Sequence, residues 1–481
     1  MSGRWSVAIS AEVLNVLSKH LLRDDAQEDI CFALWRPTRG ERRTTALVHS
    51  VVVPEAGERH VHGNASFESR YFLRALQLAA TSDSGLALLH SHPQGDGWQG
   101  LSDDDDAAER GHAAQARAIT GHPLLGMTLA GDGQWSARVW MKIAPRQYQA
   151  HWCETVRGVT EHFRISYNPR LLPDPPPNPH LVRTISAWGE RAQADLARLH
   201  IGIVGLGSVG SMVAEAIARM GVVRLSLFDF DSVERHNLDR CLHARVEDIG
   251  RAKAAVVAAA VSGNATAAAP DIQHREVSVA EEEGYRCALD CDVLFCCVDR
   301  PWGRQVLNHI AYAHLIPVVD GGIDVRTRPS GMRGAHWRAH IAAPGRRCLE
   351  CLGQYDPGMV EADRLGHLDD ATYIDKLPSN HPLRRNENVF PFSMNVASFE
   401  VLQFVRMIIA PAGLANVGRD DYQFALGVHQ RLLDTCESTC WYSTGYLAQG
   451  ENVGFTPYAP HPAAAAARAR RQQSAQPVGM E

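Results

Sequence analysis

A glycine-rich turn is the first pattern in this sequence that predicts chemistry. It follows the apolar stretch 201–204 and has the form G-x-G-x-x-G, with glycines at Gly205, Gly207 and Gly210. Glycines at this spacing allow a tight turn and let a phosphate group approach the backbone at the N-terminus of a helix. Asp229 ends the next apolar stretch, where an acid is placed for a ribose hydroxyl. The segment therefore predicts a nucleotide site.

Polar residues further along the chain favour ATP as the nucleotide. They are Asp231, Asn237, Arg240, Lys253 and Asp299, the last at the end of the apolar stretch 293–298. Arginine and lysine can neutralise phosphates, and a carboxylate at the end of a strand can hold Mg²⁺. A dinucleotide-dependent oxidoreductase needs the glycines and the acid and little else from this half of the domain. Such an oxidoreductase remains the alternative from another class.

A second chemical motif is the sequence HSHP at residues 90–93. His90 and His92 leave the end of a predicted strand on the same side, so both imidazoles can face one metal ion. A carboxylate about ten residues further along, from the acidic run 103–106, would be the third ligand. Three protein ligands leave a position for water, as a catalytic zinc site requires.

A general base is also required at such a site. Glu28, just before the predicted strand 30–35, is our candidate, with Glu41 as its competitor. The alternative for the whole motif is a solvated turn followed by an acidic helix start, in which Asp103 and Asp104 cap the helix.

Two close pairs of cysteines predict a structural zinc site. The pairs lie far apart in the chain and consist of Cys348 and Cys351, and of Cys436 and Cys440. Two pairs from distant segments fit a closed tetrathiolate site. A redox-active pair and four unliganded thiols are the alternatives.

The first half of the chain resembles the JAB/JAMM metalloproteases. Glu28, the H-x-H-P motif and Ser102-x-x-Asp105 carry the resemblance. Members of that family cleave peptide or isopeptide bonds after ubiquitin-like proteins. The resemblance implies zinc ligands at His90, His92 and Asp105, with Glu28 activating the bound water and Ser102 stabilising the oxyanion. The interval between His92 and Ser102 is longer than in the family pattern.

Residues 181–445 resemble the ThiF-type adenylyltransferases, the bacterial relatives of ubiquitin-activating enzymes. The resemblance rests on the combination D-x-D, N-L-x-R, lysine and aspartate that begins at Asp229. It implies that the domain binds Mg-ATP and attaches AMP to the C-terminal glycine of a ubiquitin-like or sulfur-carrier protein. Arg240, Lys253 and Asp299 would then be catalytic, and many members carry a structural zinc at the cysteine pairs.

Two further features bear on this resemblance. A long apolar helix, expected over 388–409, packs at a homodimer interface in the related enzymes. Members that form a thioester usually carry a cysteine in a crossover loop, whereas residues 352–435 contain none. The step after adenylation is therefore open, with a partner's thiol or Cys241 as the remaining sources.

Composition and patterning predict an α/β protein of two domains. A JAB/MPN-like α/β domain is expected over 1–160 and a Rossmann-like doubly wound domain over 181–445. A proline-rich linker (161–180) joins them, and the Pro/Ala/Arg-rich end, 446–481, is expected to be disordered.

The net charge of −6 disfavours a nucleic-acid partner, and no apolar run approaches the roughly 18 residues of a membrane span. The N-terminus does not resemble a signal peptide, so we expect a cytoplasmic protein without disulfides.

These patterns together predict an enzyme with two activities. It would use ATP, Mg²⁺ and Zn²⁺ to activate a ubiquitin-like protein and to process the same protein's tail, within a bacterial conjugation or defence pathway. A conjugating enzyme is a possible further partner. Activation of a sulfur carrier for cofactor biosynthesis is the alternative pathway, and a scaffold that only holds such a protein is the alternative without catalysis.

Overall fold

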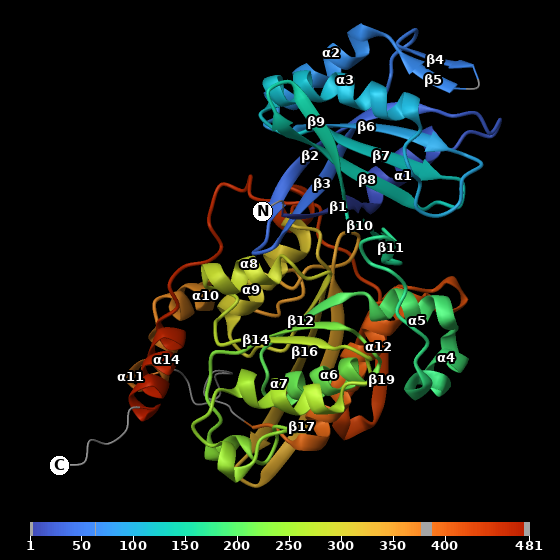
Figure 1. Cartoon of the computed structure of the whole chain (residues 1–481). Helices are drawn as coiled ribbons and strands as arrows, with labels where there is room; N and C mark the ends of the chain where they lie inside the picture. The colour runs from blue at the N-terminus through green and yellow to red at the C-terminus, as the bar shows by residue number, and fades with distance from the viewer. Residues whose placement is uncertain (1–2, 63, 377–386, 476–481) are drawn as a thin grey trace. The chain divides into compact units, whose positions relative to one another are not determined.

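The chain divides into two compact units. The computed structural model describes residues 3–62, 64–376 and 387–475. Unit 1 comprises residues 1–174 together with 313–315 and 445–454, and unit 2 comprises 175–312, 316–444 and the remainder of the chain. Each unit is built on one large sheet with helices packed against it (Figure 1). The prediction of an α/β fold is therefore confirmed.

Unit 1 contains a nine-stranded mixed sheet in the order β11-β10-β1-β3-β2-β6-β7-β8-β9. Its strands are β1 (Arg4–Ser10), β2 (Ile30–Arg39), β3 (Arg43–Val52), β6 (Gly85–His92), β7 (Leu125–Ala130), β8 (Trp135–Ala144), β9 (Gln147–Trp152), β10 (Thr155–Val159) and β11 (Arg164–Tyr167), and a separate hairpin joins β4 (Arg59–His62) to β5 (Asn64–Phe67). Its helices are α1 (Ala11–Leu21), α2 (Ser69–Thr81) and α3 (Asp103–Thr120).

The two faces of this sheet bury different helices. Along β2, Cys31 and Ala33 belong to the core that α1 covers, whereas Phe32 and Leu34 belong to the core beneath α2 and α3. This alternation is the period of two that a strand buried on both faces produces. The sheet holds the carboxyl end of β6, with the HSHP motif, beside the start of β2, because the two strands are antiparallel neighbours.

The predicted linker begins too early. Residues 164–167, expected within the proline-rich spacer 161–180, form β11 and pair with β10. Pairing through the backbone does not depend on the prolines, which all follow this strand.

Unit 2 contains an eight-stranded sheet in the order β14-β13-β12-β15-β16-β17-β18-β19. The first five strands are parallel, and the rest are antiparallel. The strands are β12 (His200–Val204), β13 (Arg224–Phe228), β14 (Asp271–Arg275), β15 (Val293–Cys296), β16 (Val318–Arg328), β17 (Gly331–Ala342), β18 (Arg419–Gln423) and β19 (Val428–Leu432).

Helices cover both faces of the parallel part. Figure 1 shows α6, α7 and α12 on one side of the sheet and α8 and α9 on the other. The helices of unit 2 are α4 (Val182–Trp188), α5 (Glu190–Ala197), α6 (Ser208–Arg219), α7 (Lys253–Asn264), α8 (Glu282–Ala288), α9 (Pro301–Ala313), α10 (Pro357–Arg364), α11 (Ala371–Lys376), α12 (Phe390–Ile409), α13 (Trp441–Thr444) and α14 (Pro462–Ala475). This arrangement is doubly wound, as predicted.

Helix α12 is the only described helix with the length and apolar composition of a membrane span. It packs against α6, β16 and β17. Its buried face includes Glu400 and Gln403 as well as Val396 and Phe404. These contacts are those of a core helix.

The prediction of a disordered end is wrong for its described part. Residues 462–475 form α14, whose Ala464 and Ala467 are buried in unit 2. Arg468 forms an ion pair with Glu281, at 2.6 Å. The helix lacks large apolar side chains, so its sequence carries no amphipathic signal, and its docking depends on arginine partners nearly 200 residues away. Residues 476–481 lie outside the described part.

Candidate functional site

The glycine turn lies between β12 and α6, at the carboxyl end of the parallel strands. Gly205 has a φ of +87°, and a Cβ there would meet the carbonyl oxygen of Cys297 at 2.6 Å. A Cβ on Gly210 would lie 1.8 Å from the carbonyl oxygen of Gly205. A Cβ on Gly207 would have no neighbour within 4 Å. The first and third glycines thus permit the tight turn and helix packing, and the second leaves the backbone open to a ligand.

Replacing Gly210 with alanine should destabilise unit 2 by about 1–3 kcal/mol, because the added methyl group has no space beside Gly205. Gly263→Ala is the matched control, because a Cβ at Gly263 in helix α7 meets nothing within 4 Å. That substitution should be neutral or stabilise by up to about 1 kcal/mol. Denaturant unfolding of both variants measures the difference. Equal stability of the two variants would contradict the packing described for the turn.

The loop after β13 joins the glycine turn to Lys253. The carboxylate of Asp229 accepts hydrogen bonds from the backbone N–H of Leu206, at 2.7 Å, and of Asp231, at 2.8 Å. The Lys253 ammonium donates to Asp231 at 3.0 Å, and its side chain is 13% exposed. Burial opposes the charge on Lys253, but Asp229 and Asp231 outweigh it and raise its pKa. Burial raises the pKa of Asp229 to about 6, against the effect of Lys253.

Some of the other residues predicted for the nucleotide site lie next to Lys253. Leu206, Asn237, Cys241 and Lys253 line one small cavity. The amide oxygen of Asn237 accepts from the N–H of Glu234 at 2.9 Å, so this side chain also caps a short turn. Burial raises the pKa of the Cys241 thiol, with Lys253 opposing, which disfavours a nucleophilic thiolate there.

Arg240 and Asp299 lie at the margins of this region. The Arg240 guanidinium donates to Asp239 at 2.9 Å, and Asp299 is exposed three residues after the end of β15. The roles assigned to these two residues stay predictions.

In unit 1, His90, His92 and Asp105 come together. One ligand atom from each lies within 4.8 Å of the others. The Nε2 atoms of His90 and His92 are 3.5 and 3.7 Å from the Asp105 carboxylate. Burial lowers the pKa of His90 to about 3, and the nearby carboxylate of Asp105 raises that of His92. A neutral buried imidazole, a second imidazole and a carboxylate form a donor set that suits zinc.

The structure selects Asp105 from the acidic run. Ser102 is the N-cap of α3, and its hydroxyl accepts from the N–H of Asp105 and donates to the Asp105 carboxylate at 2.7 Å. Burial disfavours the charged carboxylate of Asp105, but His92, His90 and Ser102 outweigh this effect and hold its pKa below the usual range. Asp106 instead pairs with Arg110. The helix start and the ligand cluster therefore coexist, with Ser102 rather than Asp103 or Asp104 as the cap.

Glu28 lies within electrostatic range of this cluster. Its carboxyl group is partly buried, and burial raises its pKa, with His92 opposing and Asp105 adding to the increase. Glu41 lies beyond the opposite end of β2, which at about 3.3 Å per residue places it far from Glu28. The structure thus favours Glu28 over Glu41 as the base.

A buried network behind His90 has no signal in the sequence. The hydroxyl of Thr128 lies 3.3 Å from His90 Nε2 and accepts from Arg138 at 2.7 Å. Arg138 also pairs with Glu109, and the indole N–H of Trp140 donates to Glu109 at 2.6 Å. The charged pair is fully buried. These residues orient the strand end that carries His90, and only the pairing of β6, β7 and β8 reveals them.

The four paired cysteines also converge. The thiols of Cys348, Cys351, Cys436 and Cys440 all lie within 4.8 Å of one another. The hydrogen bond from Cys348 lowers the pKa of the Cys436 thiol to about 5, against burial. Four thiols within reach of one another fit a structural zinc ion, which would tie the segment after β17 to the segment before α13.

A zinc ion in this cluster would stabilise unit 2. We expect Cys351→Ser to abolish zinc binding at the cluster and to lower the free energy of unfolding by more than about 4 kcal/mol. Cys241→Ser, at a thiol outside the cluster, is the control. Metal content and calorimetric unfolding measure the two effects. Unchanged stability in Cys351→Ser, with the zinc content equal to that of the control, would contradict a structural zinc site.

The parallel strands, the glycine turn and the helices on both faces make unit 2 a Rossmann-like domain. Residues 181–419 match the ThiF family. The chain therefore contains a ThiF-family domain.

Individual relatives match shorter stretches. The chain is 44% identical over 75 residues to tRNA threonylcarbamoyladenosine dehydratase of Escherichia coli (strain K12), which covers 16% of this chain and 28% of that protein. It is 31% identical over 123 residues to ubiquitin-like modifier-activating enzyme 5 of Oryza sativa subsp. japonica, covering 22% and 28%. The chain thus spans less than a third of the length of these relatives. A crystal structure of E. coli MccB with succinimide matches 55% of this chain and 74% of its own, at 16% identity and a TM-score of 0.43.

Proposed function

We propose that the ThiF-family domain uses ATP to adenylate the C-terminal glycine of a ubiquitin-like or sulfur-carrier protein. The observation that carries this proposal is the placement of Lys253 between the carboxylates of Asp229 and Asp231, beside an open glycine turn. The family match and the relative named as a ubiquitin-like modifier-activating enzyme support it. The two relatives carry names of different activities, and the choice of a carrier protein as substrate follows the second of them.

The chemistry requires control of charge. A terminal carboxylate must approach the α-phosphate of ATP, although both groups are anionic. Its oxygen attacks the α-phosphorus, the bond to the oxygen that bridges the α- and β-phosphates breaks, and pyrophosphate leaves. Lys253 and Arg240 supply positive charge for the phosphates, and the backbone at Gly207 lets them approach the N-terminus of α6. Asp231 and Asp299 are the residues that would hold Mg²⁺, which neutralises further phosphate charge when bound.

The test compares this chemistry with that of an oxidoreductase. The purified chain, given ATP, Mg²⁺ and a small carrier protein ending in glycine, should release pyrophosphate and form the carrier adenylate. A nicotinamide cofactor that copurifies with the protein, together with no carrier-dependent pyrophosphate release, would support the oxidoreductase instead.

We propose for unit 1 a zinc-dependent peptidase that acts on the tail of the same carrier protein. His90, His92 and Asp105 would hold the ion, which when bound polarises a peptide carbonyl and acidifies water. Glu28 supports this role because partial burial raises its pKa toward the range of a general base. The Ser102 hydroxyl holds Asp105 through the capping hydrogen bonds, so we assign Ser102 mainly the role of positioning that ligand.

Placing both activities on one chain would bring the two sites close to the same substrate. Both sites would bind the same C-terminal tail, and a covalent connection raises its effective concentration at the second site. We propose that a conjugating enzyme with its own thiol accepts the activated tail, because residues 352–435 contain no cysteine and burial raises the pKa of the Cys241 thiol. We also propose a homodimer through unit 2, supported by exposed apolar side chains on β19 and α12, among them Val428, Leu432 and Leu402.

A further inference from the structure

The Asp229–Asp231 loop has two sides with different partners. The carboxylates of Asp229 and Asp231 face the glycine turn and Lys253. The residue between them, Phe230, contacts the C-terminal segment of the chain instead. Its carbonyl oxygen accepts a hydrogen bond from Arg471 at 2.8 Å, and its ring lies 5.0 Å from that of His461. A single loop thus connects the nucleotide side with a segment some 240 residues further along the chain.

His461 is held firmly beneath this loop. It is 3% exposed and stacks on Trp302, with ring centroids 5.0 Å apart and an interplanar angle of 13°. Its Nδ1 accepts a hydrogen bond from the N–H of Ala464 in the first turn of α14. The ring therefore gives Phe230 a fixed surface on which to rest.

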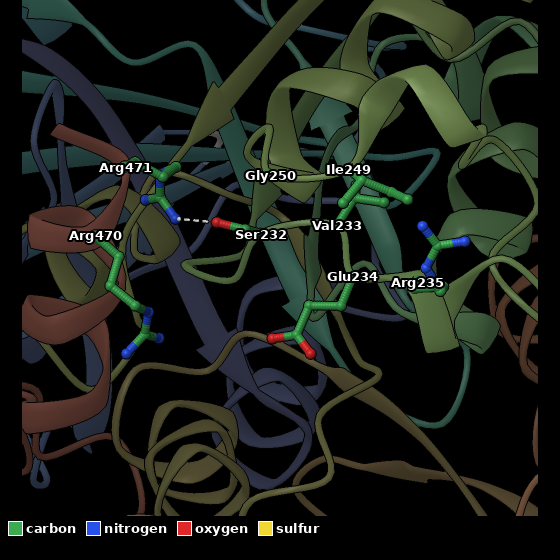
Figure 2. A pocket seen from close by; sticks show the side chains of 8 residues that line it. All are labelled: Ser232, Val233, Glu234, Arg235, Ile249, Gly250, Arg470 and Arg471. Carbon is green, nitrogen blue, oxygen red and sulfur yellow. Dashed lines mark hydrogen bonds between the residues drawn. The ribbon is translucent and has the colours of Figure 1, made fainter. Parts of the chain in front are cut away.

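Arg471 is fixed from several directions. Besides the carbonyl of Phe230, its guanidinium donates to the hydroxyl of Ser232 at 3.2 Å, and it pairs with Glu276 at 3.0 Å. Glu276 follows β14, the edge strand beside β13. Arg471 thereby ties the end of β14 and both ends of the turn around Asp231 to one helix. Figure 2 shows its side chain reaching from α14 to Ser232.

The rest of the interface between α14 and this loop is not tightly packed. A cavity of about 300 Å³ lies there, lined by Ser232, Val233, Glu234, Arg235, Ile249, Gly250, Arg470 and Arg471 (Figure 2). Beside this cavity, the hydrogen bonds of Arg471 rather than a broad apolar contact hold the loop. Val233 lines both this cavity and the small cavity that Lys253 lines, so the two cavities approach each other at this residue of the loop.

We propose that the C-terminal segment positions the carboxylates of Asp229 and Asp231 for ATP, with Arg471 and His461 as positioning residues. This inference rests on the proposed adenylation. Holding Phe230 from behind fixes the backbone of its two acidic neighbours, and hence the distance of Asp231 from Lys253. Loss of the Arg471 hydrogen bonds should let the loop move. We therefore expect weaker ATP binding, with a smaller effect on the rate of the chemical step.

The test measures Mg-ATP binding by calorimetry, and the KM for ATP and kcat in pyrophosphate release. Arg471→Ala is compared with Arg470→Ala, which removes the same charge from an exposed side chain of the same helix. Arg471→Ala is expected to raise the dissociation constant and the KM for ATP roughly tenfold, with kcat changed less. Arg471→Lys, which can still donate to Phe230, should recover most of this loss, and Arg470→Ala should resemble wild type.

The outcomes distinguish a failure of the proposed adenylation from a failure of the positioning role alone. Wild-type protein that binds no ATP would overturn the adenylation itself. Wild-type protein that binds ATP, with equal affinities in Arg471→Ala and Arg470→Ala, would overturn the positioning role alone. A parallel loss of kcat, affinity and thermal stability that lysine does not rescue would also overturn it. If Arg471→Ala does not fold, His461→Gln decides: it should raise the KM for ATP, whereas His461→Phe, which keeps a ring against Phe230, should keep an affinity within about threefold of wild type. Equal affinities in these two variants would overturn the positioning role.

Discussion

Replacing Lys253 with alanine should reduce carrier-dependent pyrophosphate release by about 10²–10³-fold, the range for losing one group that stabilises developing charge. Lys253 is largely buried between two acidic side chains. Without its ammonium group, Asp229 and Asp231 would repel the triphosphate at short range in a poorly solvated place. The pKa of Asp229, already raised to about 6 by burial, would rise further, because Lys253 opposes that increase.

Two other variants show that the effect is local. Lys142→Ala removes an exposed lysine from unit 1 and should leave pyrophosphate release unchanged. Lys253→Arg keeps the charge and should retain part of the activity, although the planar guanidinium does not match the position of an ammonium ion. Wild-type rates in Lys253→Ala would remove Lys253 from the site and weaken the choice of ATP as the nucleotide.

His92→Ala should abolish the peptidase activity that we propose for unit 1, with a loss of at least about 10³-fold. The imidazole of His92 lies 3.7 Å from Asp105 and forms one third of the ligand set, so the variant should also lose the zinc that we propose for unit 1. The substrate for this measurement is a carrier protein extended by several residues after its glycine. His151→Ala, on strand β9 away from β6, is the control and should cleave normally.

The same variant also tests whether the two activities are separate. His92→Ala should adenylate a carrier that already ends in glycine at the wild-type rate and fail only on the extended form. Lys253→Ala should show the opposite pattern. Full cleavage by a zinc-free His92→Ala protein would contradict the assignment of the metal site, whatever the adenylation result.

The parts of the fold that the sequence predicted are those with strong local periodicity. Strand β12, the turn at Gly205 and helix α6 fall where the pattern placed them, because an apolar strand and a glycine turn leave few alternatives. Helices α4 and α5, which precede this strand, are separated at Gly189, whose φ is +90°. Strands β1, β9, β10 and β14 were not predicted, since they mix polar and apolar residues and are defined by partners elsewhere in the chain.

The candidate sites likewise include residues that the sequence predicted and residues that only the structure identifies. Spacing predicted that His90 and His92 would meet a carboxylate from residues 103–106, and that the four cysteines would converge. The sequence left the choice within residues 103–106 open, and the capping hydrogen bonds of Ser102 decided it. Arg138 and Arg471 carried no signal, because an arginine is informative only once its buried partner is known. Buried ion pairs of this kind depend on tertiary contacts that periodicity does not encode.

The measurement that tests the central claim most directly is mass spectrometry of a glycine-terminated carrier protein incubated with this chain, ATP and Mg²⁺. The account predicts a carrier whose mass increases by that of an adenylyl group, with pyrophosphate released in equal amount. The product should be absent with Lys253→Ala and with a carrier that lacks its terminal glycine. A carrier of unchanged mass, despite ATP binding by the wild-type protein, would contradict the proposed function.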